Sequence, residues 1–110
     1  MANVSEALEN VKAIRDRLKN CHRHLADRDA GAAVAAIERM SEESDCEACE
    51  KIETDLLFLL RSLQLCPRPR REDRFHYAKQ EVDWYLERYE EKVQEGEEKL
   101  EALQNDGVEA

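Results

Sequence analysis

Apolar residues recur at steps of three and four along the first quarter of the chain. Seven residues form this stripe: Val4, Leu8, Val11, Ile14, Leu18, Cys21 and Leu25. Asn3 followed by Glu6 is a capping-box pattern, which marks the start of a helix. Because the spacing puts all seven side chains on one face, the sequence predicts an amphipathic helix over residues 4–26.

A second helical segment is predicted over residues 30–65. Asp29 is suited to cap its start, and the alanine-rich run that follows is a strong helix former. Ser44 with Glu47 forms another capping-box pattern, which favours a break at 41–44 and a new helix after it. Neither Gly nor Pro lies there, so one continuous helix is also compatible with the sequence, and both alternatives stay open.

A third long helix is predicted over residues 72–104, because Pro67 and Pro69 end the preceding segment before the apolar spacing resumes. The apolar positions are Phe75, Val82, Leu86, Tyr89, Val93, Leu100 and Leu103, with Lys79 and Gly96 completing the repeat. Four heptads of this regularity predict a coiled-coil seam. Residues 105–110 are expected to fray after an Asn-Asp-Gly stop.

These patterns predict an all-α fold in a single domain over residues 1–110. The chain has only three Gly, two Pro and 5% aromatic residues, and it is rich in Ala, Glu, Leu and Arg, a composition typical of long helices. Short connectors make helices that are neighbours in the sequence pack antiparallel. We therefore expect an antiparallel bundle of three long helices, or of four if the chain breaks at 41–44.

Charge and hydropathy limit the kinds of partner and the location that the sequence predicts. The formal net charge is −9 and the isoelectric point about 4.9, which disfavours binding to nucleic-acid phosphates. The longest apolar run has five residues, far fewer than a membrane span needs. The start of the chain lacks the basic and apolar regions of a secretion signal. We therefore predict a cytoplasmic protein that does not enter a membrane.

Two pairs of potential metal ligands have the spacing of structural zinc sites. Cys21 and His24 form the first pair, and Cys46 and Cys49 form the second. The opposing interpretation is that these cysteines lie on apolar stripes as small core residues. A slow thiol switch at the second pair is a further alternative, since a helix start lowers thiol pKa values. The prediction is a protein without a cofactor, with zinc as the alternative.

Two further clusters are candidates for binding. Four arginines could hold an anion, or they could neutralise the acids beside them: Arg68, Arg70, Arg71 and Arg74. A run of apolar residues surrounds its helix, so one bundle face cannot bury all of it. The predicted interface consists of Leu56, Leu57, Phe58 and Leu60. We expect a two-fold homodimer with Leu57 or Leu60 at its centre.

The function predicted from these features is non-enzymatic. No nucleophile-and-base arrangement is evident, and the aromatic residues gathered on the last helix indicate core packing or a partner surface. The prediction is a helical protein–protein interaction or oligomerisation module, acting on a protein partner or on a second copy. The alternatives are a small zinc-stabilised or thiol-responsive regulator and, third, an acidic inhibitor that mimics nucleic acid.

Overall fold

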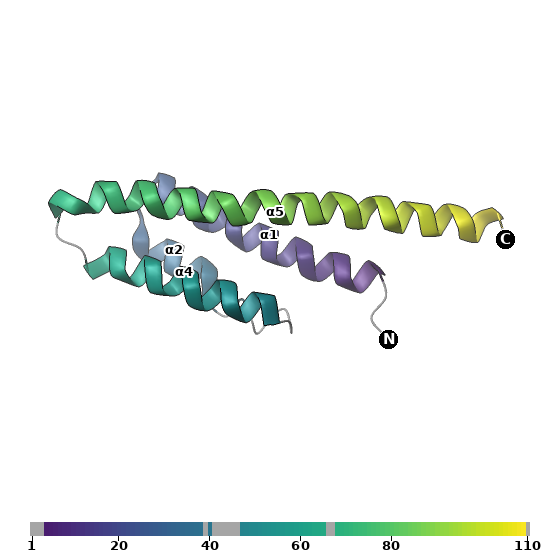
Figure 1. Ribbon diagram of the computed structural model, residues 1–110, viewed down its shortest axis with the longest axis horizontal. Helices are drawn as coiled ribbons and strands as arrows, with labels where there is room; N and C mark the ends of the chain where they lie inside the picture. The colour runs from purple at the N-terminus through teal and green to yellow at the C-terminus, as the bar shows by residue number, and fades with distance from the viewer. Residues whose placement is uncertain (1–3, 39, 41–46, 66–67, 110) are drawn as a thin grey trace.

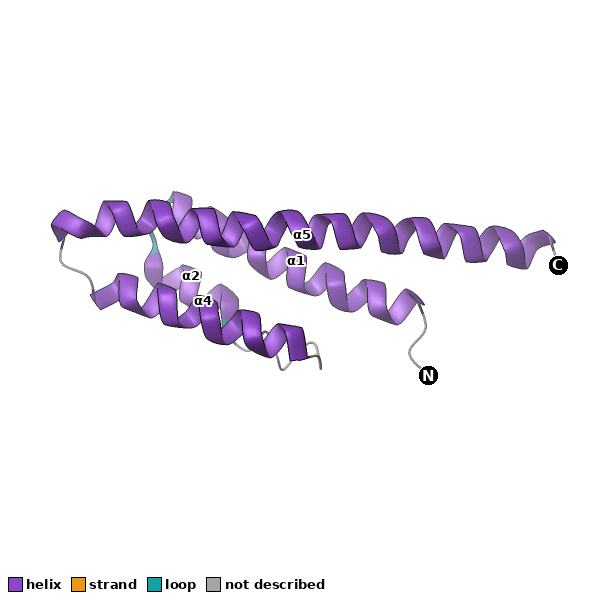
Figure 2. Cartoon of the chain, in the orientation of Figure 1, coloured by secondary structure: helices purple, strands orange, loops and turns teal. Residues whose placement is uncertain are grey.

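The computed structural model describes residues 4–38, 40, 47–65 and 68–109. This part of the chain forms four helices and no strand (Figures 1 and 2), which confirms the predicted all-α bundle. The helices are α1 (Val4–Ala26), α2 (Ala30–Ile37), α4 (Glu47–Leu65) and α5 (Arg68–Glu109). Helix α1 has the predicted bounds. The molecule is elongated, with extents of 63 × 21 × 16 Å.

The four helices form two antiparallel pairs. Helix α1 packs along α5, and α2 with α4 forms a second layer beneath the half of this pair that contains the start of α5 (Figure 1). Helix α4 packs mainly on α2 and less extensively on α5. Three contacts follow the antiparallel course of α1 and α5: the ion pair Lys12–Glu97 at 3.6 Å, the contact of the His22 ring with the Asp83 carboxylate at 4.0 Å, and the ion pair of Glu72 with Arg28 in the turn after α1.

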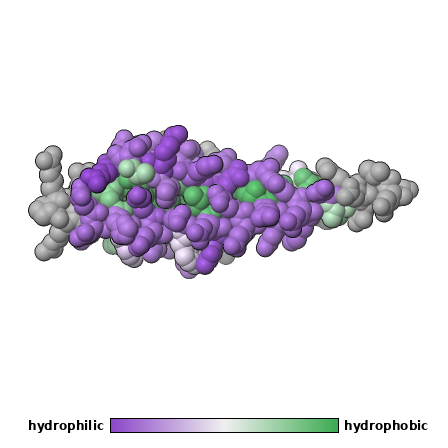
Figure 3. Space-filling view, turned by 90° about the horizontal axis from the view of Figure 1, so that it is seen from above, coloured by the Kyte–Doolittle hydropathy of each residue, from purple (hydrophilic) through white to green (hydrophobic). Residues whose placement is uncertain are grey.

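The apolar stripes predicted from the sequence form the core. On α1, Leu8, Ile14, Leu18, Cys21 and Leu25 are buried. On α5, the buried seam positions are Phe75, Val82, Tyr89 and Val93. Ala78 is also fully buried although it lies outside the predicted seam, where Lys79 is only half-buried. From above, the surface is mostly hydrophilic, with apolar patches in a broken line along the long axis (Figure 3).

The turn between α1 and α2 is built from local hydrogen bonds. The Asp29 N–H donates to the carbonyl of His24 (2.8 Å), and the Arg28 N–H donates to that of Leu25 (3.0 Å). These two hydrogen bonds together form a Schellman motif. In this motif Arg28 adopts the left-handed backbone conformation, with φ 60°. The Asp29 carboxylate then accepts from the Ala32 N–H (3.0 Å), so the predicted cap of the second segment is present.

Within the described residues the middle segment contains α2 and α4, and α2 ends earlier than expected. Helix α2 ends at Ile37, and Glu38 leaves the helix with φ −54° and ψ 141°. The break expected at 41–44 lies outside the described residues. Arg17 of α1 accounts for the earlier end, because its guanidinium donates to the carbonyls of Ala36 (3.2 Å) and Glu38 (2.9 Å). The two carbonyls belong to the last turn of α2 and to its C-cap, and Arg17 supplies a donor to both from another helix.

Helix α5 is longer than predicted at both ends. It begins at Arg68 instead of residue 72, because proline at position 69 falls in the first turn, where its missing N–H needs no partner. It also continues to Glu109, past the stop expected after residue 104. The predicted frayed tail is therefore helical as far as Glu109.

Candidate protein-interaction surface

The apolar run of α4 is divided between the core and the surface. Leu56 and Leu60 are buried, and Leu60 has no exposed surface. Leu57 is half-buried, whereas Phe58 is 77% exposed. The expectation that Leu56 and Leu60 take part in a contact between chains is corrected, because the core of a single chain encloses both. Helices α2 and α4 pack on each other, and residues of both lie in one core cluster.

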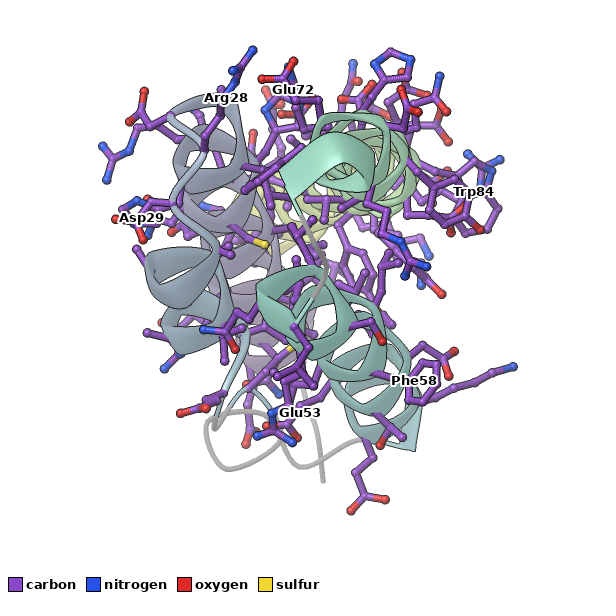
Figure 4. The ribbon with its side chains drawn as sticks, turned by 90° about the vertical axis from the view of Figure 1, so that its left-hand side faces the viewer. Arg28, Asp29, Glu53, Phe58, Glu72 and Trp84 are labelled. Atoms are coloured by element: carbon purple, nitrogen blue, oxygen red, sulfur yellow. The ribbon has the colours of Figure 1, made fainter. Side chains whose placement is uncertain are left out.

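Four large apolar side chains are exposed on α4 and α5, two helices that pack on each other. They are Phe58 and Leu65 on α4 and Tyr77 and Trp84 on α5, and we call this surface the α4–α5 face. Each pair is separated by seven residues, so its members share one stripe of their helix. Figure 4 shows Phe58 and Trp84 projecting from the same side of the molecule. Leu65 is 85% exposed, the highest value among the exposed large hydrophobic residues of the described chain.

Neighbouring side chains hold Trp84 in place. Its ring meets that of Tyr85 edge to face, with centroids 5.1 Å apart, and the Arg88 guanidinium lies 4.0 Å above it. Burial raises the pKa of Tyr85, and the charges of Asp55 and Glu81 raise this pKa further. Asp55 belongs to α4, so a neutral Tyr85 phenol sits at the contact between the two helices. The exposed indole of Trp84 is thus supported on a packed base.

The surface of α4 is hollowed around Phe58. One groove of about 460 Å³ is lined by Thr54, Leu57, Phe58, Arg61, Ser62 and Leu65. A second, of about 470 Å³, lies between α2 and α4 and shares Arg61 and Leu65 with the first. Shallow apolar grooves that border exposed aromatic rings are typical of surfaces on which a helix docks.

The predicted arginine cluster lies at the start of α5. Arg74 is exposed, and Arg68, Arg70 and Arg71 lie on the first turn of α5 with side chains outside the described set. Anion binding by these arginines stays a prediction. Arg61 of α4 is paired with Glu38 at 3.5 Å, and both side chains are exposed to about half. Arg61 also lines a groove together with Phe58.

The candidate zinc ligands are only partly described. Cys21 is fully buried in the core, and burial raises the pKa of its thiol to about 12. His24 is half-buried on α1, Cys46 lies outside the described residues, and Cys49 lies on α4 with its side chain outside the described set. Within the described residues, no three potential ligand side chains come together. Zinc binding by the full set of four stays a prediction.

Comparisons with known proteins do not assign this chain to a class. No family model, curated protein or solved structure matches it. Among the described residues, no helix combines the length and apolar character needed to cross a bilayer.

The interface predicted from the sequence contained Phe58 but not the three other residues of this face. Leu65, Tyr77 and Trp84 fall between the apolar stripes of their helices, and this is the signal by which they could have been found. A large apolar residue placed off the buried stripe has to point to solvent.

Proposed function

We propose that this protein is a non-enzymatic helical interaction module that binds another protein through its α4–α5 face. The observation that supports the proposal is the exposure of Phe58, Leu65, Tyr77 and Trp84 on two adjacent helices, with Phe58 and Trp84 projecting from the same side. Scattered exposed apolar residues are ordinary on soluble proteins, but large ones that border a groove, as Phe58 and Leu65 do on α4, are characteristic of binding sites.

The chemistry of this face suits a helix of the partner. Aromatic residues and arginine dominate binding energy at protein interfaces, and Trp84 with Arg88 and Phe58 with Arg61 supply both types. Trp84 and Tyr85 are held by packing before binding, so little side-chain entropy is lost when a partner arrives. The grooves beside Phe58 can accept the apolar side chains of one helical face.

Photo-crosslinking in cells of the source organism tests this proposal. The photoreactive residue p-benzoyl-phenylalanine is placed at position 58, and a matched variant carries it at position 19, where Lys19 is exposed on α1. Irradiation should give discrete protein adducts from position 58 and none from position 19. The identity of the captured protein does not affect this test. Equal labelling from both positions, or none from position 58, would refute the proposed function.

A further inference from the structure

The outer side of α4 is a stripe of exposed residues with Phe58 at its middle. Phe58 is 77% exposed, and its ring projects outward from the helix (Figure 4). A helix turns by about 100° per residue, so Phe58 points away from the α4 side chains that enter the core. Those side chains are Ile52, Leu56, Leu60 and Leu63. The exposed stripe continues on both sides of Phe58 through Lys51, Thr54, Asp55, Arg61 and Leu65.

Charges of opposite sign flank Phe58 at equal spacing. Asp55 comes three residues before it and Arg61 three residues after it, and both are exposed. Arg61 pairs with Glu38 at 3.5 Å, yet 58% of its side chain is exposed, so its guanidinium has further N–H donors for a second carboxylate. The stripe therefore carries an acid and a base at matching distances from its centre.

Space for a second helix lies along the same stripe. The groove beside Phe58 includes Thr54 and Ser62, four residues before and four after it, whose small side chains leave room next to the ring. A further hollow of about 460 Å³ lies toward the start of α4. It is lined by Glu50, Lys51, Thr54 and Asp55. A helix laid along α4 therefore finds space from residue 50 to residue 65, a length of about 24 Å.

An antiparallel second copy of α4 matches this arrangement residue by residue. When a two-fold axis passes beside Phe58 at right angles to the helix, the residue three before Phe58 in one copy lies opposite the residue three after it in the other. Asp55 of each copy then faces Arg61 of the other on the flank of the contact. In a parallel pair every residue would face itself, so that Asp55 would meet Asp55 and Arg61 would meet Arg61, and like charges repel. The charges of α4 therefore select the antiparallel arrangement.

We infer that the partner of α4 is a second copy of this chain, and that the two α4 helices pack antiparallel about a two-fold axis at Phe58. The inference rests on the proposed function and names the occupant of the α4 part of the α4–α5 face. The two Phe58 rings meet at the axis beside the groove of the other copy, and an Asp55–Arg61 pair closes each flank. Because the same surface of both copies is used, association stops at two chains.

Sedimentation equilibrium of the purified protein measures whether two copies associate. A contact made by one helix from each copy is small compared with the interfaces of permanent dimers, so we expect a dissociation constant of about 100 µM. The mass should rise with concentration and level off at twice that of one chain. A monomer at about 1 mM would overturn the inference, and so would a mass that keeps growing beyond two chains.

Charge reversal tests how the two helices are aligned. Asp55→Arg places arginines opposite each other on both flanks, and Arg61→Asp places acids there, so each variant should weaken dimerisation at least about tenfold. The matched control is Glu90→Arg, which makes the same change of charge as Asp55→Arg at an exposed position of α5 and should not weaken dimerisation. Phe58→Ala removes the central ring without a change of charge and should weaken dimerisation by a similar factor, with circular dichroism unchanged. Wild-type dimerisation of Asp55→Arg or of Phe58→Ala would overturn the inference.

Restoring the opposite charges provides the decisive measurement. A mixture of Asp55→Arg with Arg61→Asp regains an opposite-charge pair on both flanks, and so does the double variant that carries both changes in one chain. Both should associate more tightly than either single variant. Failure of either to recover would overturn the inference, and recovery of the mixture alone is the pattern of a parallel pair. If the purified protein is monomeric but position 58 captures another protein in cells, the second copy is excluded and the proposed function stands.

Discussion

Arg17 is expected to determine where α2 ends, and replacing it tests this directly. Its guanidinium donates to the carbonyls of Ala36 and Glu38, 19 and 21 residues away in the chain. In Arg17→Met the side chain still covers the helix surface but has no donor. The carbonyls of Ala36 and Glu38 then lose this donor. Because Ile37 lies between them in the core, loosening this turn also disturbs buried packing.

The magnitude follows from the two hydrogen bonds. A hydrogen bond from a charged donor contributes about 1.5–3 kcal/mol when it is shielded from water. The hydrogen bond to Ala36 is partly buried, whereas the hydrogen bond to Glu38 is exposed. In the variant, water can therefore replace much of the stabilisation that the bond to Glu38 provides. We therefore expect the free energy of unfolding to fall by about 2 kcal/mol, which lowers the melting temperature of a chain of this size by about 8 °C.

Urea denaturation of Arg17→Met and of a matched control measures this effect. The control is Lys19→Met, which removes an exposed charge from the same helix and should change stability by less than about 0.5 kcal/mol. Amide hydrogen exchange in α2 should accelerate in Arg17→Met and not in the control. Equal stability of the two variants would refute the role given to Arg17.

Three further outcomes are expected. Asp29→Ala should lower the free energy of unfolding by about 1 kcal/mol in urea denaturation, because the Ala32 N–H loses its acceptor, and an unchanged midpoint would contradict this cap. Gly96→Ala should raise the melting temperature slightly, because alanine favours the helix by about 1 kcal/mol relative to glycine. The Cβ of Ala at position 96 would lie 2.8 Å from the end of the Leu8 side chain, and Leu8 borders a hollow of about 250 Å³ into which this side chain can move. A lower melting temperature would show that Leu8 cannot move. Above pH 9 the unfolded chain loses the Cys21 proton while burial retains it in the folded chain, because the folded pKa is raised from 9.0 to about 12. Stability is therefore lost as pH rises, and at pH 10.5 the wild type should have lost about 2 kcal/mol more than Cys21→Ala, measured by urea denaturation relative to pH 8. Parallel losses would contradict this.

The burial of the α4 residues could be predicted only in part from the sequence. The sequence indicated that the apolar run of α4 could not all be buried, and Phe58 is exposed as expected. The sequence did not indicate which of these leucines would be buried in the core, because a helix that is apolar on all sides has no preferred buried face. Leu60 lies in the core cluster that also contains Val34 and Ile37 of α2, so its burial depends on how the helices pack.

The sequence alone determined that the chain is helical, where α1 begins and ends, and which of its side chains form the core. These properties depend on the spacing of apolar residues and on capping residues that are close together in the sequence, so they can be read from the sequence itself. Only the tertiary structure decided the end of α2 and the exposed surface of α4 and α5. No Gly or Pro marks the end of α2 in the sequence. The hydrogen-bond donor at this helix end is Arg17, which lies on another helix. A helix end without a local stop is set by whichever distant group satisfies its carbonyls, and an apolar face is exposed or buried according to the helix placed against it.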